Sequence, residues 1–216
     1  MDYAAARRNM VESQLRPNKV TDPAVLDALA TTPRELFVAE GMRGVAYADD
    51  DVPVGLGRFM MEPMFLGRLL QLASIGPGDA ALVVGAATGF TPAVVARLAG
   101  RTIAVESDAQ LAKRARETLA ALGIGNVAIV EGNLADGAPR QAPYDVIAFD
   151  GSVDDIPATI VDQLAEGGRL VAVVRQDRIG RAVLLTRDRG VVARLTAFDA
   201  SVPPLPGFER AAVFSF

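Results

Sequence analysis

Short apolar runs alternate with amphipathic stretches from residue 63 to residue 174. The runs have the length of buried strands, and the stretches between them repeat apolar residues every three or four positions, as helices do. This alternation predicts a doubly wound α/β fold, in which helices cover both faces of a mainly parallel sheet. The expected strands are 80–84, 102–105, 127–130, 144–149 and 169–174, and the expected helices are 63–73, 91–98, 108–122 and 156–164.

The end of the chain follows a different pattern. Residues 182–187 and 191–197 have strand-like composition and flank Asp188-Arg189-Gly190, a combination typical of an antiparallel hairpin. Residues 211–216 predict a last strand. We therefore expect a mainly parallel, seven-stranded sheet with an antiparallel hairpin in its C-terminal part.

The first 63 residues are expected to cover the α/β core. Residues 2–15 have the apolar spacing of a helix, and a second helix is expected at Pro23, capped by the preceding Thr21-Asp22. Residues 47–63 show no clear period and predict a long irregular loop, whose apolar side chains argue against disorder. The expected organisation is one domain over 1–216, with the cover and an active-site loop in 1–63 and the nucleotide-binding core in 64–216.

The turn after the first strand of this core carries the clearest chemical signal. It reads Gly85-Ala86-Ala87-Thr88-Gly89, and Glu106 ends the next strand about 20 residues later. Small residues let a ligand approach the backbone, and the following helix presents free N–H groups. A carboxylate at this distance can accept both hydroxyls of a ribose. A structural strand–helix–strand unit without a ligand is the plain alternative.

The residues of the turn restrict the classes of ligand that can bind there. No Gly-Lys-Ser/Thr follows it, which excludes a phosphate-binding P-loop. Ala87 stands where a dinucleotide-binding pattern has its second glycine, so a pyrophosphate is a poor fit. A nucleoside with a short zwitterionic tail, such as S-adenosylmethionine, suits this turn better.

Composition restricts the partners and the catalytic groups. Half of the residues are apolar and the net charge is −4, which indicates a soluble globular protein and argues against a nucleic-acid partner. No apolar run is long enough for a membrane span and no signal pattern is present, so we expect a cytoplasmic protein. Cysteine and histidine are absent, which removes thiol nucleophiles, serine–histidine–acid triads and most metal sites, and no metal is expected. Catalysis must therefore depend on other polar groups or on a reactive cofactor.

Several motifs are spread along the chain up to about residue 175. They are Met10–Pro17, Pro33–Val38, Tyr47-Ala48-Asp49, Val54-Gly55-x-Gly57, Pro63, Pro77-Gly78-Asp79, the turn Gly85–Gly89, Glu106, Tyr144-Asp145 and Leu164–Leu170. Together they resemble the protein-L-isoaspartate O-methyltransferase family, which belongs to the class I methyltransferases. The N-terminal motif is the most specific of them, because the nucleotide-binding half alone would fit any class I methyltransferase. The likeness weakens beyond residue 175.

The resemblance implies a Rossmann-like class I fold and methyl transfer from S-adenosylmethionine to the free carboxylate of isoaspartyl residues in damaged proteins. By position, Gly85, Ala86, Ala87 and Gly89 would line the methionine and ribose part, and Glu106 would hold the ribose. Asn133 would meet the adenine, where the family usually has aspartate. An amide keeps an acceptor and gains a donor, so it is compatible with that role. A cap for the turn at the strand end is an equally plain role for Asn133.

The chain departs from the family in the loop that contacts the substrate. The family reads roughly Gly-Gln-Thr-Ile-Ser-x-Pro, whereas this chain reads Gly57-Arg58-Phe59-Met60-Met61-Glu62-Pro63. Met61 replaces the serine and cannot donate a hydrogen bond, and by residue type Met60 and Met61 are more often core residues. Arg58 is a candidate for orienting the substrate carboxylate, although a solvated loop charge is its plain alternative.

Asp150 follows a strand end, where this fold places functional groups, and so joins the expected cofactor site. A cap for the next helix is the favoured role of its side chain, and a base or a metal ligand are alternatives. For the whole chain, we expect a carboxyl methyltransferase with an isoaspartyl protein or peptide as substrate. The alternatives are a non-catalytic nucleoside-binding or regulatory protein and a methyltransferase for a different acceptor.

Overall fold

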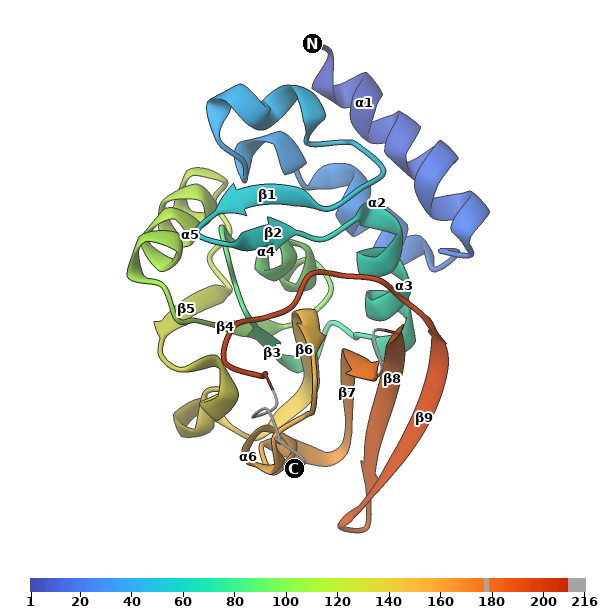
Figure 1. The fold of residues 1–216 in the computed structure, drawn as a ribbon, viewed down its shortest axis with the longest axis vertical. Coiled ribbons are helices and arrows are strands. Elements are labelled where there is room, and N and C mark those ends of the chain that lie inside the picture. Colours follow the sequence, from blue (N-terminus) through green and yellow to red (C-terminus); the bar gives the residue numbers. More distant parts are fainter. Residues whose placement is uncertain (177–178, 210–216) are drawn as a thin grey trace, which may run out of the picture.

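A seven-stranded sheet crosses the centre of the molecule in the order β5-β4-β3-β6-β7-β8-β9 (Figure 1). The computed structural model describes residues 1–176 and 179–209. Strands β3 to β7 are parallel, whereas β8 pairs antiparallel with both of its neighbours. The strands are β3 (Ala80–Val84), β4 (Arg101–Glu106), β5 (Val127–Glu131), β6 (Tyr144–Val153), β7 (Leu164–Gln176), β8 (Ile179–Asp188) and β9 (Val191–Asp199).

The direction in which strands are added reverses beside β3. From β3 the chain adds β4 and β5 on one side of the sheet, and it then returns to place β6 and β7 on the other side. In a doubly wound fold such a reversal leaves a crevice at the carboxyl ends of the strands, where ligands bind. The predicted mainly parallel sheet and its C-terminal hairpin are therefore confirmed, and their topology marks one end of the sheet as a candidate site.

Helices pack on the sheet as the apolar spacing predicted, with one difference. The core helices are α3 (Pro63–Ala73), α4 (Phe90–Ala96), α5 (Ala109–Ala121) and α6 (Ala158–Val161). The prediction of a helix over 156–164 was too long, because Leu164 already pairs with Tyr144 as the first residue of β7. The predicted strand over 211–216 lies outside the described residues.

Helical segments of the N-terminal part lie over α3 and α4, as expected for a cover (Figure 1). Asp22 caps α2 by accepting hydrogen bonds from two backbone N–H groups, as the sequence predicted. The first helix continues past α1 as a π-helical turn, which buries Val11 and Leu15. The segments are α1 (Tyr3–Met10), the π-helix Val11–Leu15, α2 (Pro23–Thr31) and the 3-10 helices Arg16–Asn18, Arg34–Leu36 and Glu40–Val45.

The prediction of an irregular loop over 47–63 was wrong, because this segment contains an antiparallel hairpin. Its strands are β1 (Val52–Gly55) and β2 (Arg58–Met60). Gly55, Leu56 and Gly57 all have positive φ, at 105°, 53° and 71°, which closes the turn between the strands. The strands have four and three residues, too few for a sequence period to show.

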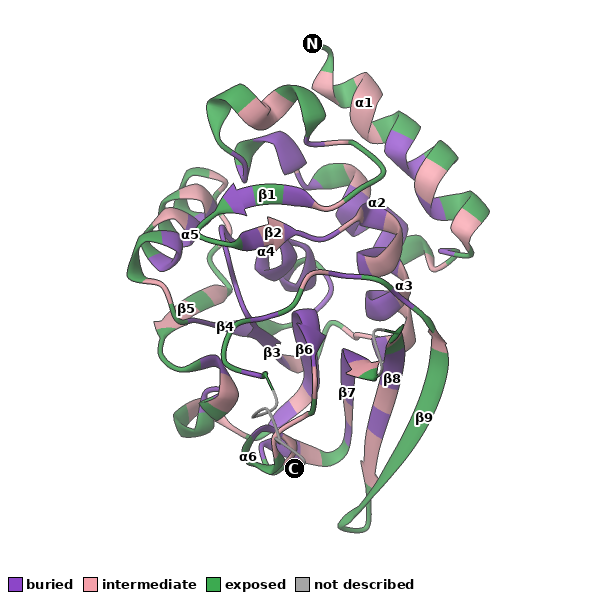
Figure 2. Ribbon diagram, viewed as in Figure 1, coloured by how far each residue is buried: buried purple, intermediate pink, exposed green. Residues whose placement is uncertain are grey.

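Two hydrophobic clusters, one on each face of the sheet, form the core. Successive residues of β3 alternate between them: Ala81 and Val83 belong to one cluster, and Leu82 and Val84 to the other. Figure 2 shows that buried residues concentrate in the central strands, whereas β9 is exposed except at Phe198, which is half-buried. Within the described residues, no helix combines the length and apolarity needed to span a bilayer.

Candidate cofactor-binding and active site

The turn after β3 is buried and lies at the crevice of the sheet. The N–H groups of Gly85 and Ala86 both donate to the carbonyl oxygen of Val105, at 3.0 and 2.9 Å, which ties the turn to β4. Gly89 has a φ of 98° and precedes α4, and a Cβ added there would lie 3.1 Å from the Cβ of Ala115. The glycine therefore allows α5 to approach, which brings a second helix close to the turn.

Glu106 is fully buried at the carboxyl end of β4. Its Oε2 accepts from the N–H of Ala87 at 2.6 Å, and its Oε1 accepts from the N–H groups of Ser107 and Asp108 at 2.9 and 3.1 Å. Backbone donors from both sides thus fix the carboxylate. A fixed carboxylate beside a glycine turn suits a ribose.

Arg58 reaches this carboxylate from the hairpin. It begins β2, is 5% exposed, and its Nη1 lies 2.9 and 2.8 Å from the two carboxylate oxygens of Glu106. Its Nη2 is buried and has no hydrogen-bond partner within the described part of the chain. A Cβ added at Gly85 would lie 2.7 Å from this Nη2, so the guanidinium fills the space over the turn.

Asp150 lies inside β6, so the expectation that it caps the next helix was wrong. The cap position of α6 is Pro157, which makes no side-chain cap. Strand β6 continues past Asp150 because Ser152 and Val153 pair with Val173 and Val174 of β7. Ser152 also bonds to the C-terminal segment: its N–H donates to Pro203 O, and its carbonyl accepts from Leu205 N–H, both at 2.8 Å. These partners lie later in the chain, so the local sequence around Asp150 does not reveal them.

The side chain of Asp150 faces the same turn. Its Oδ1 accepts from the hydroxyl of Thr91 at 2.8 Å, in the first turn of α4. Burial raises the pKa of Asp150 to about 7, against the opposing effects of the Thr91 hydrogen bond and the charges of Arg58 and Arg34. The carboxyl group can therefore change its charge near neutral pH.

Asn133 is exposed, and its side chain caps a turn. Its Oδ1 accepts from the N–H of Ala135 at 3.3 Å, at the start of the 3-10 helix Leu134–Asp136. The capping role considered from the sequence is thus confirmed. Asn133 also lies near the C-terminal segment, since a Cβ added at Gly207 would be 3.8 Å from its Oδ1. The expected contact with adenine stays a prediction.

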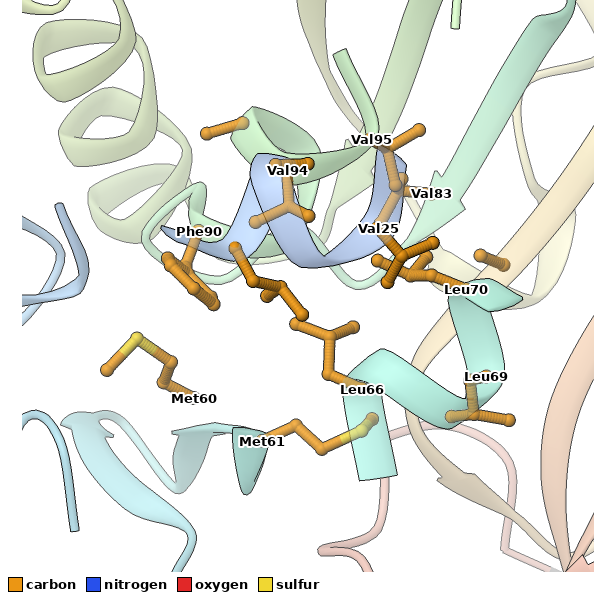
Figure 3. Close-up of a cluster of buried hydrophobic side chains, with 14 of the residues drawn as sticks. Val25, Met60, Met61, Leu66, Leu69, Leu70, Val83, Phe90, Val94 and Val95 are labelled. Carbon is orange, nitrogen blue, oxygen red and sulfur yellow. The ribbon is translucent and has the colours of Figure 1, made fainter. Parts of the chain in front are cut away.

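Met60 and Met61 lie in the core, which confirms the interpretation made from residue type. Both are 2% exposed. Figure 3 shows them among buried side chains that include Leu66 of α3 and Phe90 of α4. The Met61 side chain therefore fills apolar space in this structure.

Arg34 is a buried residue whose importance the sequence analysis missed. It is 0% exposed, and it donates from Nε to Ala46 O at 2.6 Å and from Nη2 to Met61 O at 2.8 Å. Its guanidinium also lies 4.8 Å from the centre of the Phe90 ring. Arg34 thus holds the chain at both ends of the 47–63 segment. In the sequence, Arg34 stands out only as part of the segment Pro33–Val38 that resembles the family. That resemblance assigns no role to Arg34.

The C-terminal segment was also missed, and it lies across the same end of the sheet (Figure 1). Leu205 is buried, and its Cδ2 lies 2.7 Å from the position of a Cβ at Gly85. Phe208 packs edge-on against Phe149 of β6, with ring centres 5.6 Å apart. In the sequence, the only indication that this segment covers the sheet is the presence of apolar residues within a proline-rich stretch.

The polar groups and the glycines at this end of the sheet fit a nucleoside cofactor. Glu106 supplies fixed acceptors, and Gly85 and Gly89 keep the turn open where a Cβ would meet a neighbour. The buried Nη2 of Arg58, without a partner among the described residues, is a donor that a ligand could use. In the structure, however, Arg58 itself occupies the acceptors of Glu106.

Comparison with known sequences gives a consistent family. The chain matches the family model described as protein-L-isoaspartate(D-aspartate) O-methyltransferase over residues 6–198. It is 37% identical over 205 residues to the protein-L-isoaspartate O-methyltransferase of Koribacter versatilis (strain Ellin345), covering 95% of this chain and 92% of that protein. It is 39% identical over 186 residues to protein-L-isoaspartate O-methyltransferase 1 of Rhodopseudomonas palustris (strain HaA2), covering 86% and 76%.

Comparison with solved structures supports the fold. A structure titled protein-L-isoaspartate O-methyltransferase superposes with a TM-score of 0.83 at 24% identity, over 93% of this chain and 66% of that one. A Plasmodium falciparum protein described by the same activity, solved in complex with S-adenosyl-L-homocysteine, gives a TM-score of 0.79 at 19% identity, over 94% and 97%. These matches confirm the predicted fold class.

Proposed function

This chain belongs to the protein-L-isoaspartate O-methyltransferase family, and we propose that it uses S-adenosylmethionine to methylate the free carboxylate of isoaspartyl residues in proteins. The observation that carries this proposal is the position of Glu106. Its carboxylate is fixed by three backbone N–H groups beside the Gly85–Gly89 turn, at the carboxyl end of a parallel strand next to the crevice. This is where a doubly wound fold binds the ribose of a nucleoside.

The residues proposed for the cofactor site come from the turn after β3, the end of β4, the turn after β5 and strand β6. The backbone of the turn would receive the methionine part, Glu106 would accept from the ribose hydroxyls, and Asn133 would meet the adenine. Asp150 would lie close to the cationic part of the cofactor. When bound, S-adenosylmethionine supplies a methyl group on a sulfonium, which is a good leaving group. The turn residues in this proposal are Gly85, Ala86, Ala87 and Gly89.

The acceptor requires little acid–base chemistry from the chain. A carboxylate is already ionised at neutral pH, so it can act as the nucleophile without a general base. This agrees with a sequence that has no histidine and no cysteine. Arg58 and the backbone of the hairpin would orient the carboxylate, because a guanidinium pairs well with that group. Met61 stands where the family's loop has a serine, so the reaction would proceed without a hydroxyl contact from this position.

The cellular role follows from the substrate. We propose an isoaspartyl protein or peptide as partner and the repair of damaged cytoplasmic proteins as the setting. The net charge of −4 disfavours phosphate-rich partners such as nucleic acids. Methyl transfer to a different acceptor remains the alternative within the same chemistry.

Binding of S-adenosylhomocysteine and methyl transfer to an isoaspartyl peptide test the proposal separately. Calorimetric titration should give saturable binding. Glu106→Ala should weaken it by about 1–3 kcal/mol, because two hydroxyls lose a charged acceptor. Glu117→Ala is the matched control, since Glu117 is exposed and forms a long ion pair with Lys113 on α5. Absence of binding at millimolar concentration would contradict the cofactor assignment.

A non-catalytic nucleoside-binding protein is the second candidate, and the position of Met61 favours it. Met61 stands where the family has a serine, and its side chain is buried in the core, so it supplies no hydroxyl contact to a substrate. Radiolabelled methyl transfer decides between the two. Incorporation into an isoaspartyl peptide, and none into the matching aspartyl peptide, supports the enzyme. Intact binding of S-adenosylhomocysteine with no incorporation supports the non-catalytic protein.

A further inference from the structure

Arg58 and Glu106 form an ion pair that is more deeply buried than any other pair between described residues. The side chains are 5% and 0% exposed, and their closest approach is 2.8 Å. The two residues are 48 positions apart and belong to different sheets, so the pair connects the hairpin to the central sheet. It lies on the carboxylate that the proposed function gives to the ribose.

The geometry of the pair is incomplete. A single nitrogen, Nη1, serves both carboxylate oxygens, whereas the strongest arginine–carboxylate pairs use two parallel N–H···O bonds. The other terminal nitrogen, Nη2, is buried without a partner among the described residues. A buried pair that leaves a donor unsatisfied recovers little of the cost of removing both charges from water.

Glu106 does not need Arg58 to stay in place. The N–H groups of Ala87, Ser107 and Asp108 hold its two oxygens from the backbone. Loss of the guanidinium would therefore leave a positioned carboxylate with free acceptor capacity. The partners that a ribose offers, two hydroxyl donors, can use that capacity.

We propose that Arg58 is a latch on the cofactor site, which occupies Glu106 until the ribose of the cofactor displaces it. The inference rests on the proposed function, because it assigns Glu106 to the ribose. The guanidinium and the side chain of Leu205 both fill the space over Gly85, so entry of a nucleoside requires both side chains to move away from the turn. Because of the latch, the affinity for the cofactor is lower than it would be if Arg58 did not pair with Glu106.

Calorimetric titration of the variant Arg58→Gln with S-adenosylhomocysteine and with adenosine tests the latch. Both ligands should bind about ten- to a hundredfold more tightly than to the wild type, since a charge-assisted contact no longer competes. Arg58→Met, which keeps the apolar stem without the charge, should give the same change and guards against a folding defect of the first variant. Arg116→Gln is the matched control, because it removes an arginine from an exposed pair with Glu131 and should leave affinity unchanged.

Each result of this titration has a defined meaning. Unchanged or weaker binding of both ligands would overturn the latch while leaving the cofactor assignment intact. Weaker binding of S-adenosylhomocysteine alone would make Arg58 a ligand for the methionine carboxylate and would also overturn the latch. No binding to any folded variant would overturn both the latch and the proposed function. A second readout is thermal unfolding: the ligand-induced rise in melting temperature should be larger in Arg58→Gln, which a purely structural defect would not produce.

Discussion

At the scale of single residues, Ala87 accepts an unfavourable backbone conformation in order to serve the site. Its φ is 46°, in the left-handed region that costs a residue with a Cβ about 1–2 kcal/mol. The same conformation aims its N–H at Glu106, at 2.6 Å. The missing glycine of the turn therefore weakens the fold locally without removing the donor.

Replacement of Ala87 by glycine should leave the melting temperature within about 2 °C of the wild type, since relief of strain offsets the lost methyl group and the greater freedom of the unfolded chain. The control is Ala93→Gly at a buried position in α4. This variant should lower the melting temperature by about 4–8 °C, because glycine is unfavourable inside a helix and no backbone strain is relieved. Thermal unfolding by circular dichroism measures both. Equal losses in the two variants would show that Ala87 is not strained.

Met61 gives a second prediction for a single residue. Because its side chain is 2% exposed among apolar neighbours, Met61→Ser should destabilise the protein by about 2–4 kcal/mol, through a cavity and a buried hydroxyl. Met61→Leu keeps the volume and should cost less than about 1.5 kcal/mol. Urea titration gives both free energies. A serine variant as stable as the leucine variant would contradict the core position of Met61.

At the scale of elements, the β1–β2 hairpin is short and depends on contacts outside itself. Arg34 holds the chain before it at Ala46 and after it at Met61. Arg58 joins it to β4 through Glu106. Two arginines thus position a small sheet that local hydrogen bonding alone would leave marginal.

Arg34→Lys tests this dependence. A lysine ammonium cannot reproduce the two hydrogen bonds that the planar guanidinium makes, so the variant should lose about 2–4 kcal/mol of stability. Hydrogen exchange should accelerate first in residues 47–63. The control is Arg16→Lys, because Arg16 forms an exposed pair with Glu12 and its replacement should cost less than about 0.5 kcal/mol. Unchanged exchange in the hairpin would remove Arg34 from this role.

At the scale of the whole molecule, burial of carboxyl groups at the site links stability to pH. Burial raises the pKa of Asp150 to about 7 from its ordinary value of 3.8. The folded state therefore binds this proton more tightly than the unfolded state does. The stabilising contribution is complete below pH 3.8 and is lost as the pH rises to about 7. The groups that act on Asp150 are Thr91, Arg58, Arg34 and Glu106.

Asp150→Asn should remove part of this pH dependence. Between pH 5 and pH 8, the wild type should lose free energy of unfolding relative to the variant, whose amide carries no charge at either pH. Denaturant titrations of both proteins across about pH 5–8 measure the difference. Glu62 is the control, because its pKa is also raised to about 7 by burial, with Asp49, Asp51 and Asp50 adding to the effect, and it remains in both proteins. Parallel curves would show that Asp150 does not titrate in this range.

The sequence by itself determined the order of elements in the core and the place of Glu106 at the end of the strand that follows the glycine turn. Apolar periodicity predicted α3 from Pro63 to Ala73 as the structure has it, because burial against the sheet demands that spacing. The spacing from Gly85 to Glu106 was equally informative, since a strand, a turn, a helix and a strand have nearly constant lengths. These features depend on residues close together in the chain.

Tertiary structure alone decided which distant groups meet at the site. The pairing of Arg58 with Glu106, the support of the hairpin by Arg34 and the bonds between Ser152 of β6 and the Pro203–Leu205 segment all join residues far apart in sequence. No period or motif encodes such contacts, because they depend on how separate elements pack. Local spacing therefore located Glu106 beside the turn, whereas packing determined that Arg58 pairs with it.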